Sequence, residues 1–410
     1  MSALATALVR LGDEVTGADR TLGTPNIKFL ESLGVKVYPD DGSGVDVATD
    51  EVIVSTAIEE TNAGLIKAKE LGIPVTHRAK ALSRTLKEYK LVAVVGTCGK
   101  STVTAMLGHV LVECGLDPMC VNGANVPGWE GAVRFGKGEY AVAEVDESDK
   151  SLVAFKPHAA IVTNASADHY SKEEMDEVFD SFIKDCPGPV VDGRNVCPRI
   201  SRIDTDERED WVTPLPGKHN LQNAALAAKM ALALGCKAED IKRALASFRG
   251  VERRLQLISQ PLNLSTSQPA PAVYDDYAHN PEKLKAMWMT LAEKHPGGIC
   301  VIWRPHGYAP LRKMMDSLAE MFCETVRSCD KLLLLPVYDA GGTADRSVSS
   351  GDLLEKVKVK GEGEQRCVLV SDLEAAYVWC EAHKGDYAAF VTCGARDPGL
   401  PALAKRLSEM

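Results

Sequence analysis

The chain has 410 residues, of which 45% are hydrophobic and 25% charged, and its formal net charge at pH 7 is -10. This length predicts more than one compact core, and the negative charge argues against non-specific binding to nucleic acid or an anionic membrane surface as the main role. No apolar run approaches the roughly 20 residues of a membrane span, and the N-terminus lacks the basic start and long apolar core of a signal peptide. Twelve cysteines without CxxC pairing favour reduced thiols, and we expect a cytoplasmic protein.

The first part of the chain alternates predicted helices and strands. After an N-terminal helix, the expected elements are a strand over 14–19, a helix over 24–34, strands over 35–39 and 51–58, and a helix over 62–72. Strands that alternate with helices predict a parallel sheet with helices on its faces. A charged stretch over 78–90 then leads to a glycine-rich loop, so we place the end of a first domain at residue 88.

The alternation continues through two further segments. The second segment shows strands over 140–146 and 159–166, followed by helices over 172–186 and 220–235. The third shows apolar strands at 271–278, 297–304, 331–338, 365–371 and 387–394. We therefore predict an α/β protein with domains over 1–88, 89–249 and 250–410.

A short loop follows the aliphatic run 91–95 and has the sequence GTCGKST over 96–102. Backbone N–H groups of a glycine turn at the start of a helix are suited to bind phosphate. Lys100 would reach the phosphate oxygens, and the Ser101 hydroxyl would be a ligand of Mg²⁺. The full phosphate-loop motif has a glycine where Val94 stands, so a tight strand-to-helix turn with a chance lysine remains an alternative.

Acidic and histidine side chains follow two of the predicted strands, where α/β proteins place ligands. Glu144 ends one strand and His169 follows another. Mg²⁺ prefers hard oxygen ligands, which favours Glu144 over His169 as a metal ligand. The alternatives are a solvated acidic loop for the first residue and a capping or core histidine for the second.

Five stretches taken in order, GTCGKST, AEVDESD, NASADHY, PGKHNLQNAALAA and YDDYAHNP, resemble the Mur ligase family. The resemblance implies three domains: a Rossmann-like N-terminal domain that binds a UDP-sugar, a central phosphate-loop ATPase domain, and a Rossmann-like C-terminal domain for the amino acid and ATP. It also implies an ATP-dependent ligase that joins an amino acid, with L-alanine expected, to the carboxylate of UDP-N-acetylmuramate. Such an enzyme acts in peptidoglycan precursor synthesis, and thereby in cell-wall biogenesis, cell shape and division.

The resemblance also assigns roles by position. The implied catalytic residues are Lys100, Arg254 and His279. The implied ATP-binding residues are Gly96, Thr97, Gly99, Lys100, Ser101, Thr102, His219, Asn220, Asn223, Arg254 and Asp276. The implied metal ligands are Ser101, Glu144 and His169, and the implied substrate residues are Asp19, Ser55, Thr56, His279 and His306. For Asn220, simple helix capping is an alternative.

The implied chemistry converts the carboxylate into an acyl phosphate, with release of ADP, before an amine attacks. Two anions must approach each other, so Lys100, Arg254 and Mg²⁺ would supply positive charge. His279 would accept a proton from the ammonium group. Because these residues belong to two predicted domains, domain closure would assemble the site.

Three departures from the family pattern bear on the substrate. The N-terminal glycine loop that approaches the UDP diphosphate is absent, so we expect weakened binding of the UDP-sugar. Gly307 stands where the alanine-adding enzymes carry an arginine, which Arg304 or Arg312 would have to replace. Asn280 replaces the second histidine of the usual pair.

Other functions remain open at this stage. They are a related ligase that takes a different amine, such as a recycled cell-wall peptide, and a non-catalytic paralogue that binds nucleotide. A dinucleotide-dependent oxidoreductase is disfavoured because no GxGxxG is present. We expect a monomer or homodimer with neither nucleic-acid nor membrane partners.

Overall fold

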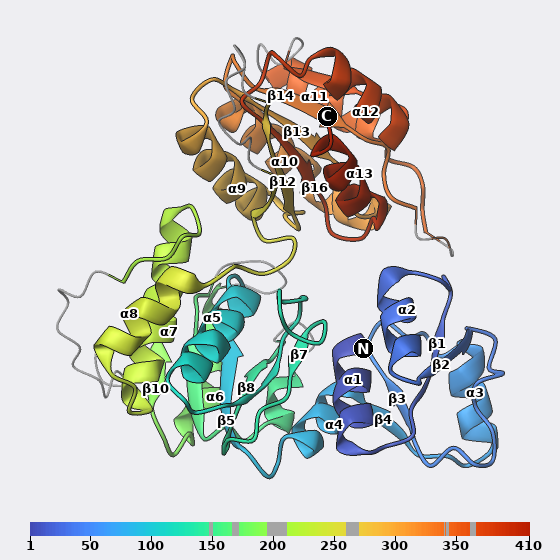
Figure 1. The fold of residues 1–410 in the computed structure, drawn as a ribbon. Helices are drawn as coiled ribbons and strands as arrows, with labels where there is room; N and C mark the ends of the chain where they lie inside the picture. The colour runs from blue at the N-terminus through green and yellow to red at the C-terminus, as the bar shows by residue number, and fades with distance from the viewer. Residues whose placement is uncertain are drawn as a thin grey trace. The chain divides into compact units, whose positions relative to one another are not determined.

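The computed structural model describes residues 1–146, 151–165, 172–194, 211–259, 270–339, 341, 344–360 and 366–410. The chain forms two compact units (Figure 1). Unit 1 comprises Met1–Pro214 and His219–Val251, and unit 2 comprises Leu215–Lys218 and Glu252–Met410. The boundary at 251/252 lies beside the predicted boundary at 249/250. The predicted division at residue 88 stays a prediction.

The first part of unit 1 carries short strands that pair in parallel, β1 with β2 and β3 with β4. Its elements are α1 (Ser2–Leu11), β1 (Thr16–Asp19), α2 (Pro25–Ser32), β2 (Lys36–Pro39), β3 (Val52–Val54), α3 (Ala63–Glu70), β4 (Val75–His77) and α4 (Arg78–Thr85). The start of α2 is capped by the Thr24 side chain, which accepts a hydrogen bond from the backbone N–H of Ile27. Asn62 caps α3 in the same way, through Leu65. Such caps satisfy backbone donors that a helix start leaves unpaired.

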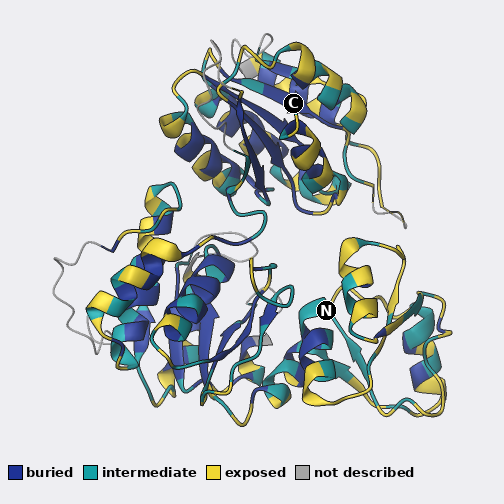
Figure 2. Cartoon of the chain, in the orientation of Figure 1, coloured by how far each residue is buried: buried dark blue, intermediate teal, exposed yellow. Residues whose placement is uncertain are grey.

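A larger sheet forms the rest of unit 1, with strand order β10-β9-β5-β8-β6-β7 among the described residues. Its elements are β5 (Lys90–Val95), α5 (Lys100–Glu113), β6 (Met119–Val121), β7 (Val133–Arg134), β8 (Tyr140–Glu144), the 3₁₀ helix η1 (Ser151–Ala154), β9 (Ala159–Val162), α6 (Lys172–Lys184), β10 (Val190–Asp192), α7 (Lys218–Ala233) and α8 (Ala238–Ser247). β7 is antiparallel to its neighbour, and the other pairs are parallel. β5 lies between β9 and β8, and its residues after Lys90 are buried, as the dark strands of Figure 2 show.

Unit 2 is built around a second sheet, whose order is β11-β12-β16-β13-β14-β15 in the described part of the chain. Its elements are β11 (Gln256–Ser259), β12 (Ala272–Asp276), α9 (Pro281–Lys294), β13 (Ile299–Trp303), α10 (Tyr308–Thr325), β14 (Lys331–Leu334), α11 (Ser350–Lys360), β15 (Cys367–Leu369), α12 (Leu373–Ala382), β16 (Ala389–Cys393) and α13 (Gly399–Leu407). Alternate residues of its strands contribute to two apolar clusters, one with α9, α10 and α11 and one with α12 and α13. Helices therefore cover both faces of a sheet that is parallel except for β11, which pairs antiparallel with β12.

The predicted α/β class with parallel sheets is confirmed, and so are all five apolar strands expected in the last segment. The strand expected over 51–58 is shorter, because β3 ends at Val54 and a turn follows. The elements β4, α4, β6, β7, β10, α8 and β11 were not predicted.

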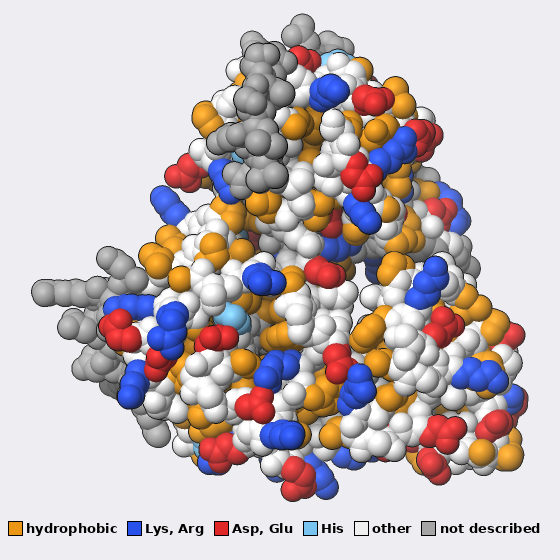
Figure 3. Space-filling model, in the orientation of Figure 1, with side chains coloured by type: hydrophobic (Ala, Val, Ile, Leu, Met, Phe, Trp, Pro, Cys, Tyr) orange, Lys and Arg blue, Asp and Glu red, His pale blue; other side chains and the backbone are white. Residues whose placement is uncertain are grey.

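No helix in the described ranges is long and apolar enough to cross a membrane. On the face drawn in Figure 3, the Lys and Arg side chains of the described residues are interspersed with Asp and Glu side chains.

Candidate active site

The loop between β5 and α5 has the backbone geometry of an anion cradle. Gly96 has φ 128° and Gly99 has φ 83°, values that side chains other than glycine rarely adopt. Gly99 is the N-cap of α5, so the first N–H groups of this 14-residue helix lie next to the loop and have no acceptor within the helix. A Cβ atom at Gly99 would lie 2.7 Å from the Asn223 Oδ1. Because glycine has no side chain, a phosphate can come close to the N–H groups at such a helix start, which is suited to bind it.

The loop is braced by the strand on one side of β5. After β9, the Thr163 hydroxyl donates to the Cys98 carbonyl (2.6 Å), and the Asn164 amide donates to the same carbonyl (3.0 Å). The Asn164 Oδ1 in turn accepts from the Thr97 hydroxyl (2.7 Å) and the Cys98 N–H (2.9 Å). Sequence reasoning missed this brace, because it depends on β9 lying next to β5.

Lys100, the first residue of α5, folds its side chain back over the loop. Its ammonium donates to the Gly96 carbonyl at 2.6 Å. The side chain is half-buried, whereas the following Ser101 and Thr102 are buried, at 4% and 6% exposed. The ammonium is therefore held at the mouth of the cradle, where a bound phosphate would need a positive charge.

Glu144 ends β8, the strand on the other side of β5, and pairs in register with Val94. Its Oε2 accepts a hydrogen bond from the Gly123 N–H at 2.7 Å. A Cβ atom at Gly123 would lie 2.5 Å from the same oxygen, so glycine is required for this approach. The buried Ser101 hydroxyl and the Glu144 carboxylate offer the hard oxygen ligands that suit Mg²⁺. His169, the third predicted metal ligand, lies outside the described residues.

The start of α7 brings the Asn223 side chain to the same loop. Asn220 and Asn223 are buried, at 4% and 7% exposed, and their side-chain amides are bonded to each other at 3.3 Å. Burial lowers the pKa of His219, which favours the neutral imidazole. Asn223 lies against Gly99, which places this predicted ATP-binding residue beside the glycine loop.

In unit 2, Asp276 ends β12 as a fully enclosed carboxylate. Its Oδ2 accepts from the Leu255 N–H (2.6 Å) and its Oδ1 from the Ala278 N–H (2.7 Å). Burial raises the pKa of this carboxyl, although both hydrogen bonds favour the charged form. Asp276 thus fixes two backbone segments, and its predicted contact with the nucleotide stays a prediction. Arg254 is half-buried, with its guanidinium 5.0 Å from the centre of the Tyr277 ring.

The structure brings His279 and His306 together at the carboxyl edge of this second sheet. Their ring centroids are 4.8 Å apart in an edge-to-face arrangement. One ring follows β12 and the other follows β13, and the His279 Nδ1 lies 2.9 Å from the Tyr277 carbonyl oxygen. Two imidazoles at the carboxyl ends of strands are suited to proton transfer.

Two of the three sequence departures, Gly307 and Asn280, lie in described parts of unit 2, and the arginines near Gly307 have structural partners. Arg304 forms a hydrogen-bonded ion pair with Asp397, and Arg312 forms one with Asp345 (2.7 Å). Asn280 is the N-cap of α9 and accepts from the Lys283 N–H at 3.0 Å. Gly307 begins α10 with an extended backbone that any residue can adopt, so the fold does not require glycine there.

The three predicted sugar-nucleotide residues lie in the first part of unit 1. Asp19 is exposed at the end of β1, and its carboxylate accepts from the Thr21 N–H at 2.9 Å. Ser55 and Thr56 follow β3 in a turn. All three stand at carboxyl ends of parallel strands, where α/β proteins bind ligands.

A braced glycine loop at the centre of a parallel sheet, joined to a second α/β unit, defines a protein of the phosphate-binding α/β class. Residues 1–90 match the Mur ligase family catalytic domain, and residues 253–396 match the Mur ligase glutamate ligase domain. A UDP-N-acetylmuramate–L-alanine ligase from Sinorhizobium medicae is 30% identical over an alignment of length 459, which covers 100% of this chain and 95% of the relative. The chain belongs to the Mur ligase family.

Solved structures show the same fold. A UDP-N-acetylmuramate–alanine ligase from Thermotoga maritima superposes with a TM-score of 0.81 at 23% identity, covering 100% of this chain and 96% of the other. A murein peptide ligase from Psychrobacter arcticus gives 0.68 at 20% identity, covering 100% and 97%. The fold is thus the three-domain architecture of the Mur ligases, and membership of the family makes the chain an ATP-dependent, ADP-forming ligase.

Proposed function

We propose that this enzyme joins an amino acid, L-alanine by preference, to the carboxylate of UDP-N-acetylmuramate in peptidoglycan precursor synthesis. The observation that carries the proposal is the 30% identity to a UDP-N-acetylmuramate–L-alanine ligase along the whole chain. The substrates, a nucleotide sugar and ATP, belong to the cytosol, which is where we propose the enzyme acts.

The loop geometry supports different binding roles for different residues of unit 1. The N–H groups at the start of α5 and the Lys100 ammonium bind the phosphates of ATP. Ser101 and Glu144 would hold Mg²⁺, which would neutralise phosphate charge when bound. The neutral imidazole of His219 and the amides of Asn220 and Asn223 contact the nucleotide.

The remaining steps fall to residues of unit 2. Arg254 supplies positive charge to the phosphoryl group that the carboxylate receives. His279, or the adjacent His306, accepts the proton that the attacking ammonium group must lose. Phosphate then leaves from the tetrahedral carbon, and an amide remains.

A second candidate substrate is a short cell-wall peptide in place of a single amino acid. Gly307 favours it, because the backbone there does not require glycine and an arginine side chain is missing from the start of α10. Arg304 and Arg312 are engaged by Asp397 and Asp345, so neither is an unpaired replacement.

An amine panel distinguishes the two candidates. ADP release is measured with ATP, Mg²⁺ and UDP-N-acetylmuramate against L-alanine, glycine, L-serine and an alanine-initiated tripeptide. We expect the highest kcat/KM with L-alanine. A tripeptide preferred by tenfold or more would assign the enzyme to peptide recycling, and sugar-independent ADP release with every amine would contradict both candidates.

A further inference from the structure

The segment that carries Arg254 has an unusual backbone. Arg253 and Leu255, its two neighbours, have φ angles of 59° and 47° in the left-handed region, which residues with a Cβ atom rarely adopt. Such a conformation persists only where surrounding contacts impose it. Arg254 is therefore held between two residues whose backbone is fixed in an unfavourable state.

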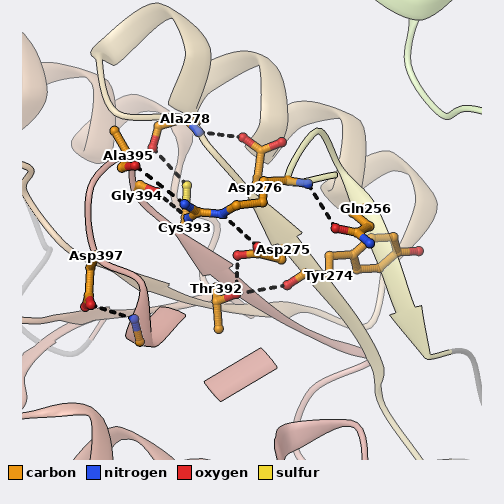
Figure 4. Close-up of polar contacts among 12 residues, drawn as sticks. Gln256, Tyr274, Asp275, Asp276, Ala278, Thr392, Cys393, Gly394, Ala395 and Asp397 are labelled. Carbon is orange, nitrogen blue, oxygen red and sulfur yellow. Dashed lines mark hydrogen bonds and ion pairs between the residues drawn. The ribbon is translucent and has the colours of Figure 1, made fainter. Parts of the chain in front are cut away.

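The contacts that impose this state centre on the Arg253 side chain. Its Nε donates to the Asp275 Oδ2 at 2.9 Å, and its terminal nitrogens donate to the Gly394 and Ala395 carbonyls. Asp275 has a side chain only 1% exposed and also accepts from the Thr392 hydroxyl at 2.7 Å. Figure 4 shows Asp275, Thr392, Gly394 and Ala395 close together, at the carboxyl ends of β12 and β16.

The backbone on both sides of Arg254 is bonded as well. The Arg253 carbonyl accepts from the Tyr277 N–H at 2.8 Å, and the backbone N–H of Arg253 donates to the Gln256 side chain at 2.9 Å. On the other side, Asp276 accepts from the Leu255 N–H. Both neighbours of Arg254 are thus tied to the end of β12, which leaves mainly its side-chain torsions free.

We propose that Arg253 is a positioning residue for the ligase reaction, which acts by holding Arg254 where the phosphoryl group must be stabilised. The inference rests on the proposed function, since it assigns Arg254 to that group. Arg253 itself is committed to Asp275 and two carbonyls. If Arg254 were misplaced, its positive charge would stabilise the phosphoryl group less in the transition state. The loss would lower kcat more than it changes the KM for ATP.

Unit 2 offers a matched control for this arrangement. Arg327 also pairs with a fully buried carboxylate, Asp330 (2.7 Å), and also donates to two backbone carbonyls, those of Ala292 and His295. Asp330 precedes β14 and accepts from the first N–H of β13. The Arg327–Asp330 pair therefore lies at the amino ends of strands in the sheet whose carboxyl ends carry the Arg253–Asp275 pair. Loss of either arginine leaves a buried carboxylate unpaired and should lower the melting temperature by several degrees.

The test compares R253Q, R253K and R327Q with the wild type in steady-state kinetics with the preferred amine. We expect R253Q to lower kcat about 10²-fold with a smaller change in the KM for ATP, R253K to retain more activity, and R327Q to keep kcat within about twofold. A kcat for R253Q equal to that of R327Q at comparable thermal stability would overturn the proposal.

Hydrogen exchange without substrates gives a second readout, independent of the ligase activity. The peptide over 252–258 should exchange faster in R253K than in the wild type or R327Q. Unchanged exchange there would refute the anchoring role even if R253Q does not fold. A wild type that turns over no amine would instead refute the proposed function, and the exchange comparison would still decide whether Arg253 fixes this segment.

Discussion

Replacing Lys100 with alanine is expected to lower the ligase kcat by about 10³-fold while leaving the fold intact. The ammonium lies 2.6 Å from the Gly96 carbonyl at the mouth of the loop, so its loss removes a positive charge from the predicted phosphate site. For stability, the substitution removes the hydrogen bond to the Gly96 carbonyl, which is worth about 1 kcal/mol. Stopped assays of ADP release, with circular dichroism and thermal melting, measure both effects.

The matched control is Lys90→Ala, at the start of β5, the strand that leads into the glycine loop. Lys90 pairs with Glu139 at 2.7 Å, and both side chains are about half exposed, so its loss should leave kcat unchanged. Wild-type turnover by a folded Lys100→Ala protein would remove Lys100 from the phosphate site.

Glu144→Gln is expected to raise the Mg²⁺ concentration for half-maximal activity about 10- to 100-fold. Glutamine keeps the shape of the side chain and can still accept from the Gly123 N–H, but it lacks the negative charge that strengthens binding of a divalent cation. The measurement is a titration of initial rate against Mg²⁺ at saturating ATP.

Asp146→Asn provides the comparison for this titration. Asp146 lies two residues further along the chain and pairs with Arg78 at 2.9 Å, so its replacement should leave the Mg²⁺ dependence unchanged. If the Asp146 variant alone shifted the titration, the metal ligand would be Asp146 and the assignment of Glu144 would be wrong.

The parallel strands of unit 2 could be predicted because each is a short apolar run bounded by turns, as buried parallel strands are. The short strands β6 and β7 hold too few residues to show any periodicity. β11 was not recognised because it is a partly exposed edge strand shortly after the predicted domain boundary at 249/250. The antiparallel pairs of β7 and β11 also depend on which strand stands at a sheet edge, which sequence patterns do not specify.

At the site, the glycine and lysine positions could be predicted because their chemistry is local to one loop. The partners of that loop could not. Asn164 reaches it only because β9 lies beside β5, and Asn223 reaches Gly99 only through the packing of α7. The Arg253–Asp275 pair likewise joins positions 22 residues apart across a sheet edge. Such contacts follow from tertiary structure and leave no pattern in a single sequence.

The central claim is that ATP activates a carboxylate as an acyl phosphate, from which an amine then displaces the phosphate. UDP-N-acetylmuramate labelled with ¹⁸O in both carboxylate oxygens tests it directly, when incubated with the enzyme, ATP, Mg²⁺ and the preferred amine. One labelled oxygen should pass to phosphate while the other stays in the amide product, and mass spectrometry of both products measures this transfer. Amide product formed together with phosphate that carries no ¹⁸O would contradict the account.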